Sequence, residues 1–131
     1  MTVPSEASAR GRYRVVHPPE RQDHSGQNLI RGFGISRTTA GSRHLSMAYG
    51  EVPIGATSER HYHPFETAVF IIAGVARSYF GAHDEDCVDV AAGDFVYIPG
   101  GLPHKTENIG GTPIRYVLAR AAPEDTVITA E

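Results

Sequence analysis

The sequence predicts an all-β protein, either a sandwich or a barrel, built from about ten short strands. Short runs rich in β-branched and aromatic residues recur along most of the chain. Glycine occurs 14 times and proline nine times, so the runs are interrupted often. No long stretch has the 3.6-residue apolar period of a helix, which argues against alternating strands and helices.

The predicted strands follow one another with little sequence between them. In chain order they span residues 12–16, 29–36, 44–52, 59–63, 67–74, 75–81, 87–90, 94–99, 104–109 and 114–120. The segments PIGA, GAHDED, AAGD, PGGLP and GGTP separate several of these runs, and they carry the glycine, proline or aspartate residues that favour turns. Hairpins and short connections are therefore expected.

The length is typical of one domain, because 131 residues and 14.1 kDa leave no room for a second useful core. We expect residues 1–11 to form a disordered N-terminal tail, since they are small, polar and without periodicity. Residues 12–131 form the predicted domain.

Charge and composition exclude several partners. A net charge of -3 and a pI near 6.1 provide no basic field for nucleic acid or for a membrane surface. The N-terminus has no apolar leader, and no run approaches the roughly 18 apolar residues that cross a bilayer. The single cysteine, Cys87, excludes an internal disulfide. The sequence therefore predicts a soluble, cytoplasmic protein.

The run TAVFIIA, residues 67–73, is apolar on both faces of its predicted strand. One face can line the interior of a barrel, but the other also needs cover. A second copy of the chain would supply that cover, so we expect a homodimer.

His61 and His63 stand at the start of this buried region. Side chains two residues apart in a strand point to the same face, with Cβ atoms roughly 6–7 Å apart. Two imidazoles at this spacing can bind one ion, but they can also be two surface side chains. A third histidine, His104, follows the rigid bend PGGLP and begins another predicted strand.

These two segments resemble the two motifs of the cupin superfamily, and in particular of small single-domain bacterial cupins. The first motif is written G-(x5)-H-x-H-(x3 or 4)-E-(x6)-G and the second G-(x5)-P-x-G-(x2)-H-(x3)-N. The matching residues are Gly55, His61, His63 and Gly74 in the first motif, and Gly93, Pro99, Gly101, His104 and Asn108 in the second.

The resemblance implies a double-stranded β-helix, or jelly roll, with one divalent metal ion inside its barrel. By position, it makes His61, His63 and His104 metal ligands. The remaining histidines are expected at the surface; they are His17, His24, His44 and His83.

The glutamate of the first motif is displaced in this chain. Thr67 occupies the usual glutamate position, and Glu66 stands one residue earlier. Alternation points Glu66 away from the face of Thr67, although a bend after Pro64 would turn it inward. We count Glu66 among the candidate ligands and leave open whether Glu66, Thr67 or neither completes the site.

Three imidazoles suit iron(II), nickel, zinc or copper, and manganese is also compatible with the family. Iron(II) is favoured here, because the resemblance implies a small-molecule oxidoreductase of the dioxygenase kind. If no carboxylate joins the three neutral imidazoles, the double charge on the ion favours an anionic substrate. One alternative is a zinc- or nickel-dependent isomerase or lyase. Another is a non-catalytic binding protein or accessory subunit.

Overall fold

A computed structural model describes residues 13–17, 22–24, 29–124 and 128–130. Nearly all regular structure in these residues is strand, which confirms the all-β prediction. The strands are β1 (Gln22–His24), β2 (Leu29–Ile35), β3 (Ser46–Val52), β4 (His61–Tyr62), β5 (Thr67–Ala73), β6 (Val75–Phe80), β7 (Asp86–Ala91), β8 (Phe95–Ile98), β9 (His104–Asn108), β10 (Ile114–Arg120) and β11 (Ile128–Thr129). The tail predicted for residues 1–11 lies outside the described part of the chain.

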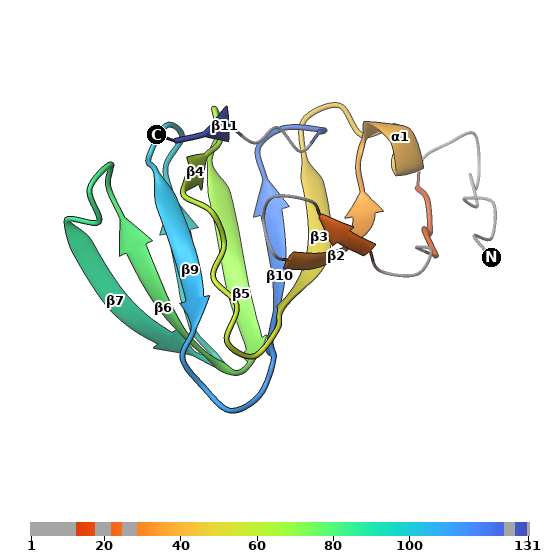
Figure 1. Ribbon diagram of the computed structural model, residues 1–131. Helices are drawn as coiled ribbons and strands as arrows, with labels where there is room; N and C mark the ends of the chain where they lie inside the picture. The colour runs from red at the N-terminus through yellow and green to blue at the C-terminus, as the bar shows by residue number, and fades with distance from the viewer. Residues whose placement is uncertain (1–12, 18–21, 25–28, 125–127, 131) are drawn as a thin grey trace.

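The strands form two antiparallel sheets. A six-stranded sheet has the order β1-β2-β3-β10-β5-β8, and a five-stranded sheet has the order β11-β4-β9-β6-β7. Figure 1 shows β6, β7 and β9 to one side of β5 and β10, with β2 and β3 farther over. Neighbours in each sheet are mostly distant in sequence, as the jelly roll predicted from the motifs requires.

Two sequence predictions need correction. Residues 12–16 were expected to form a strand, but only an isolated bridge at Tyr13 is present among residues 13–17. Tyr13 and Val15 are 57% and 46% exposed, so no sheet face buries this run. The sequence also missed the one-turn helix α1 (Arg37–Ala40), whose capping box links Ser36 and Thr39.

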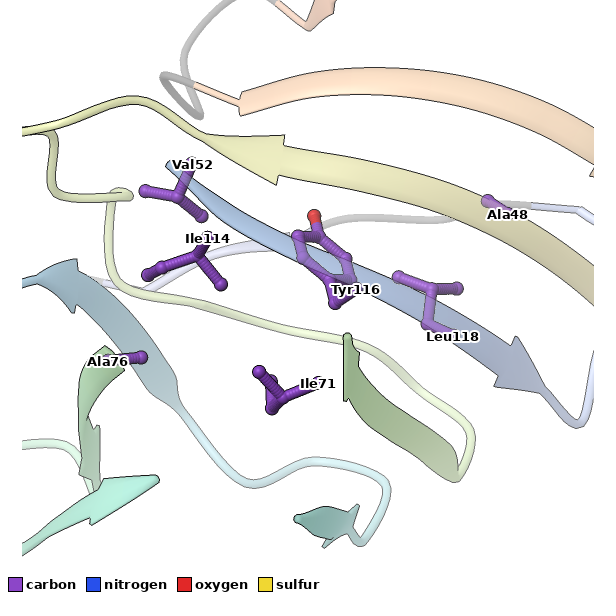
Figure 2. Packing of buried hydrophobic residues seen from close by; sticks show 7 residues of the cluster. All are labelled: Ala48, Val52, Ile71, Ala76, Ile114, Tyr116 and Leu118. Atoms are coloured by element: carbon purple, nitrogen blue, oxygen red, sulfur yellow. The ribbon is translucent and has the colours of Figure 1, made fainter. Parts of the chain in front are cut away.

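The hydrophobic core draws its buried residues from both sheets. Its buried residues are Ala48, Val52, Ile71, Ala76, Ile114, Tyr116 and Leu118. Figure 2 shows their side chains gathered around β10, which supplies Ile114, Tyr116 and Leu118. These three alternate along the strand, so the sequence period of two is what turns them inward.

The motif glycines occupy positions that need them. Gly55, Gly74, Gly93 and Gly101 all have positive φ. Gly74 alone joins β5 to β6, and a Cβ there would lie 2.8 Å from the Ile114 Cα and 3.0 Å from the Pro113 oxygen. A side chain at Gly74 would therefore push against backbone and also strain its own conformation.

Candidate metal centre

Three buried histidines converge between the two sheets. His61 lies on β4 and faces His104 on β9, because the two are register partners. His63 follows β4 directly and points to the same side as His61, as strand alternation predicts. Their exposed fractions are 4% for His61, 2% for His63 and 7% for His104.

Two of the rings are oriented by the backbone. The Nδ1 atom of His61 lies 2.7 Å from the Glu59 carbonyl oxygen, and that of His104 lies 2.9 Å from the Leu102 carbonyl oxygen. A carbonyl only accepts, so Nδ1 carries the proton in each ring and Nε2 keeps its lone pair. This is the arrangement in which imidazole binds a metal through Nε2.

The three potential donor atoms lie within 4.8 Å of one another. The ring centroids of His61 and His104 are 4.4 Å apart, and His63 lies 5.1 Å from His61 and 5.4 Å from His104. One ion can bridge such a group, because histidine–metal bonds are about 2.0–2.2 Å long and small side-chain rotations close the remaining gap. The three residues present therefore fit a divalent metal ion.

The environment of His63 differs from that of the other two. Its ring stacks on Phe65 with a centroid distance of 5.6 Å and an interplanar angle of 18°. Its Nε2 atom lies 3.3 Å from a terminal guanidinium nitrogen of Arg120. A guanidinium only donates, so this contact uses the Nε2 lone pair that a metal would also need.

A cavity of about 80 Å³ opens beside the histidines. Its walls are mostly apolar, and its polar residues gather at the histidine end of the barrel. The lining residues are Val52, Ser58, His61, His63, Thr67, Val69, Ile71, Ala76, Ser78, Phe80, Val90, Val96, Ile98, His104, Lys105, Thr106, Ile114, Tyr116, Leu118 and Arg120. None of the lining residues is an aspartate or a glutamate, so a bound cation would find no carboxylate in the wall.

Glu66 does not join the three histidines, which corrects its inclusion among the candidate ligands. Its side chain is exposed, and its Oε1 atom accepts a 2.6 Å hydrogen bond from the Tyr97 hydroxyl. That hydrogen bond raises the pKa of Tyr97, and partial burial and the negative charge of Glu66 act in the same direction. The bend after Pro64 therefore leaves Glu66 on the outer face.

Thr67 faces inward at the place where the family pattern has its glutamate. It begins β5, is 3% exposed and lines the cavity. Its Oγ1 atom is buried and makes no hydrogen bond within the described ranges of the chain. Burying a hydroxyl without a partner costs free energy, so a hydrogen-bonding group from outside the described chain, such as water or a ligand atom, would be stabilising at this position.

An ion-pair cluster on the outside supports two of the histidine-bearing segments. Asp84 accepts hydrogen bonds from Arg60 at 3.2 and 2.8 Å, and its Oδ2 atom lies 3.2 Å from the Lys105 ammonium. Arg60 precedes His61 and Lys105 follows His104, so one carboxylate ties the outer sides of both segments together. The Arg60 hydrogen bonds and then the Lys105 contacts lower the pKa of Asp84, and partial burial opposes them.

The other histidines agree with their predicted surface positions where they can be described. His17, His44 and His83 are exposed. The side chain of His24 lies outside the described part of the structure.

Asn108, the last residue of the second motif, has a structural role. Its Nδ2 atom lies within 2.9–3.3 Å of the carbonyl oxygens of Val52, Pro53 and Thr112, and its Oδ1 atom accepts from the Gly110 N–H. The side chain is 5% exposed and connects the end of β9 to two loops. It therefore holds the scaffold and does not reach the histidines.

Sequence reasoning missed Arg120. This residue ends β10, is 4% exposed and reaches the site through its contact with His63. The signal was present in the sequence, because Arg120 is in phase with the inward-facing Tyr116 and Leu118. A charged residue at the end of a strand normally faces solvent, which is why alternation alone did not single it out.

Comparison with known sequences identifies a family. A family model described as the cupin domain matches residues 48–120, a segment that contains all three histidines, Thr67 and Arg120. An uncharacterized protein of Methanocaldococcus jannaschii, MJ1618, is 34% identical over 87 residues, which cover 63% of this chain and 67% of that protein.

Solved structures give the same fold. Oxalate decarboxylase from Bacillus subtilis has a TM-score of 0.70 and 25% identity. The match covers 85% of this chain and 30% of the decarboxylase chain. The oxalate decarboxylase from Lactobacillus farciminis has a TM-score of 0.72 and 21% identity. The match covers 84% of this chain and 33% of that enzyme's chain. The polyketide cyclase RemF of Streptomyces resistomycificus has a TM-score of 0.73 and 16% identity. The match covers 86% of this chain and 80% of the RemF chain.

This chain therefore spans only about a third of the oxalate decarboxylase chains, whereas it matches most of RemF. The likenesses below 25% identity support the fold and not a shared reaction. The family match, in contrast, covers more than half of the chain and includes both histidine-bearing segments. The three-histidine cluster in its barrel thus lies in a protein that belongs to the cupin superfamily.

Proposed function

We propose that the chain is a metal-dependent enzyme for a small-molecule substrate, in which His61, His63 and His104 hold one divalent ion. Iron(II) is the favoured ion and a dioxygenase-like oxidation the favoured reaction. The observation that carries the proposal is a buried cluster of three imidazoles with no carboxylate in the surrounding wall. Such a site leaves the full double charge on the ion and several of its coordination positions open.

A bound ion would supply Lewis acidity and, if it is iron(II), one-electron chemistry with dioxygen. The protein's own contribution is to fix the rings and to limit water. Backbone carbonyls hold the rings of His61 and His104, and Phe65 stacks against that of His63. Apolar side chains such as Val69 and Ile98 line the rest of the cavity and keep its interior dry.

The size of the cavity supports a small substrate. A volume of about 80 Å³ admits a compound of a few non-hydrogen atoms and excludes a polymer chain from the interior.

A second candidate is a redox-inert reaction, an isomerisation or lyase reaction with zinc or nickel as Lewis acid. The observation that favours it is the polyketide cyclase among the similar structures; the oxalate decarboxylases do not add to it, because one of their structural studies concerns proton-coupled electron transfer. One structural study of the Bacillus subtilis decarboxylase concerns its Mn(II) centres, so manganese also remains among the ions to test.

Elemental analysis of freshly purified protein tests the proposal. The protein must carry no histidine tag, since a tag adds competing imidazoles. About one iron per chain, with oxygen consumption when small oxygen-donor compounds are added, supports the oxidation. Tightly held zinc or nickel without oxygen consumption supports the redox-inert reaction instead. Protein that cannot be loaded with any of these ions would contradict both and leave a non-catalytic binding protein.

Other expectations from the sequence stay predictions. The homodimer was inferred from residues 67–73, and the outward residues of this run include Ala68 and Ile72, both exposed. Light scattering that gives a mass near 14.1 kDa at micromolar concentration would contradict it. Within the part of the chain that is described, no helix has the length and apolar character needed to cross a membrane. The cytoplasmic location and the absence of a nucleic-acid partner likewise stay predictions.

A further inference from the structure

Thr67 and Arg120 lie next to each other at the polar end of the cavity. They are register partners on the paired strands β5 and β10, and both line the cavity. Their exposed fractions are 3% and 4%, so both side chains are almost completely buried. Two polar side chains from the six-stranded sheet thus face two histidines from the five-stranded sheet.

Thr67 offers a hydrogen bond that the described chain does not use. Its Oγ1 atom is buried without a hydrogen-bond partner in the described ranges. Buried hydroxyls nearly always have a partner, in the protein, in water or in a ligand. Because Thr67 stands where the family pattern has its glutamate, the free hydroxyl marks the place of a missing carboxylate.

Arg120 adds positive charge at the same place. Its guanidinium lies 3.3 Å from the Nε2 atom of His63 and therefore beside the position of any ion held by the three histidines. The other cationic lining residue, Lys105, has its ammonium 3.2 Å from Asp84 and 4.9 Å from the Tyr79 ring centre. Arg120 is thus the cation that reaches the histidine cluster.

A carboxylate from outside the chain matches this arrangement. A divalent ion and a guanidinium in one dry cavity repel each other, and an anion between them removes the repulsion. The planar guanidinium binds carboxylates through parallel hydrogen bonds, and the Thr67 hydroxyl can donate a further one. The same anion would draw Arg120 away from His63 and leave the His63 lone pair for the ion.

We propose that Thr67 and Arg120 form a carboxylate-binding subsite beside the three histidines, so that a small carboxylate anion takes the place of the family's glutamate. The substrate class is then a small carboxylic acid. The use of this subsite in catalysis rests on the proposed function. Binding of a carboxylate by Thr67 and Arg120 does not, because it depends on these two residues alone.

Calorimetry with pyruvate as the probe tests the subsite. Pyruvamide is its neutral counterpart, with an amide in place of the carboxylate and nearly the same shape. Both compounds are titrated into zinc-loaded and into metal-free protein, and the metal content of each sample is measured. We expect wild-type protein to bind pyruvate at least about 10-fold more tightly than pyruvamide, because only pyruvate pairs with the guanidinium.

Two variants and one control assign the effect to the two residues. Arg120→Gln should weaken pyruvate binding by at least about 10-fold. Thr67→Val, which keeps the shape of the side chain, should weaken it by about 3- to 10-fold. Arg115→Gln removes an exposed arginine from the same strand and should leave the affinity unchanged.

Stability measurements separate a binding role from a structural one. Without pyruvate, Thr67→Val should unfold at the same or a higher temperature than wild type, because it removes a buried hydroxyl that has no partner. Pyruvate should raise the unfolding temperature of wild type more than that of Thr67→Val. If Arg120→Gln folds poorly, the comparison of wild type with Thr67→Val still tests the subsite.

The results distinguish the subsite from the metal enzyme. Equal affinities for pyruvate and pyruvamide, or unchanged pyruvate affinity in both variants, would overturn the subsite even if one metal ion is bound per chain. If the protein takes up no metal but binds pyruvate in a manner that depends on Arg120, the subsite stands and the proposed function fails.

Discussion

His61 and His104 face each other across the paired strands β4 and β9, and each fixes its ring in the same way. In both, Nδ1 donates to the carbonyl oxygen two residues earlier, at Glu59 and at Leu102. The two imidazoles therefore present the same nitrogen, Nε2, to one point between the sheets. This repeated local geometry is the one in which both rings could bind a metal ion through Nε2.

Replacing His104 with alanine should abolish tight metal binding. Two imidazoles remain, and we expect the affinity for zinc to fall by at least about 100-fold. This loss is larger than the roughly 10–100-fold that follows when a residue hydrogen-bonded to a metal ligand is removed, because here a ligand itself is lost. Competition with a chromophoric chelator measures the affinity. His83→Ala is the matched control, since His83 is exposed, lies in the turn after β6 and is not one of the three clustered histidines. An equal loss in both variants would contradict the site.

Replacing Glu66 with glutamine should leave the metal content unchanged, because the side chain lies outside the barrel. The change should instead lower the pKa of Tyr97 toward the ordinary tyrosine value of about 10. Glu66 raises that pKa in the wild type by accepting the hydrogen bond and by its charge. Ultraviolet titration, with Tyr97→Phe to identify the transition, measures the shift. Metal loss in Glu66→Gln would restore Glu66 as a ligand.

Replacing Asp84 with asparagine should change how stability depends on pH. Arg60 and Lys105 lower the pKa of Asp84 in the folded protein below its unfolded value of about 3.9. A lowered pKa contributes stability that is complete above the unfolded pKa and is lost as the pH falls through the folded pKa. The wild type should therefore be the more stable protein at pH 6, and the difference should shrink below about pH 4.

Thermal unfolding of both proteins between pH 3 and pH 7 measures this difference. A gap between the two unfolding temperatures that is the same at every pH would show that the Asp84 charge is not responsible. Asp86→Asn is a suitable control, since Asp86 is exposed and belongs to the same acidic segment.

Replacing Asn108 with alanine should lower the free energy of unfolding by about 2–4 kcal/mol, since several buried backbone groups lose their partner. The Asn108 amide nitrogen donates hydrogen bonds to the carbonyl oxygens of Val52, Pro53 and Thr112. Its amide oxygen accepts one from the Gly110 N–H. Denaturant unfolding measures the loss. Below its unfolding transition the variant should still bind one metal ion per chain, because Asn108 does not reach the histidines. A metal-free but fully stable variant would contradict the structural role.

The all-β class was predictable because it depends on local pattern, whereas the jelly roll and the grouping of His104 with His61 and His63 followed from the resemblance to the cupin motifs. The apolar run at residues 67–73 and the alternation at residues 114–120, together with glycine and proline at the turns, mark strands and their ends whatever the tertiary structure. The spacing of His61 and His63 puts them on one face of a strand for the same reason. The failed strand at residues 12–16 shows the limit, since a strand forms only where a neighbouring strand and a covered face exist.

Thr67, Glu66 and Arg120 needed the tertiary structure. Whether Glu66 turns inward depends on the path of the chain after Pro64, which no local pattern sets. That Arg120 meets Thr67 depends on the register between β5 and β10, strands separated by forty residues of sequence. The sequence by itself therefore determined the barrel and its three imidazoles, whereas strand pairing decided that a buried guanidinium, and not a carboxylate, stands beside them.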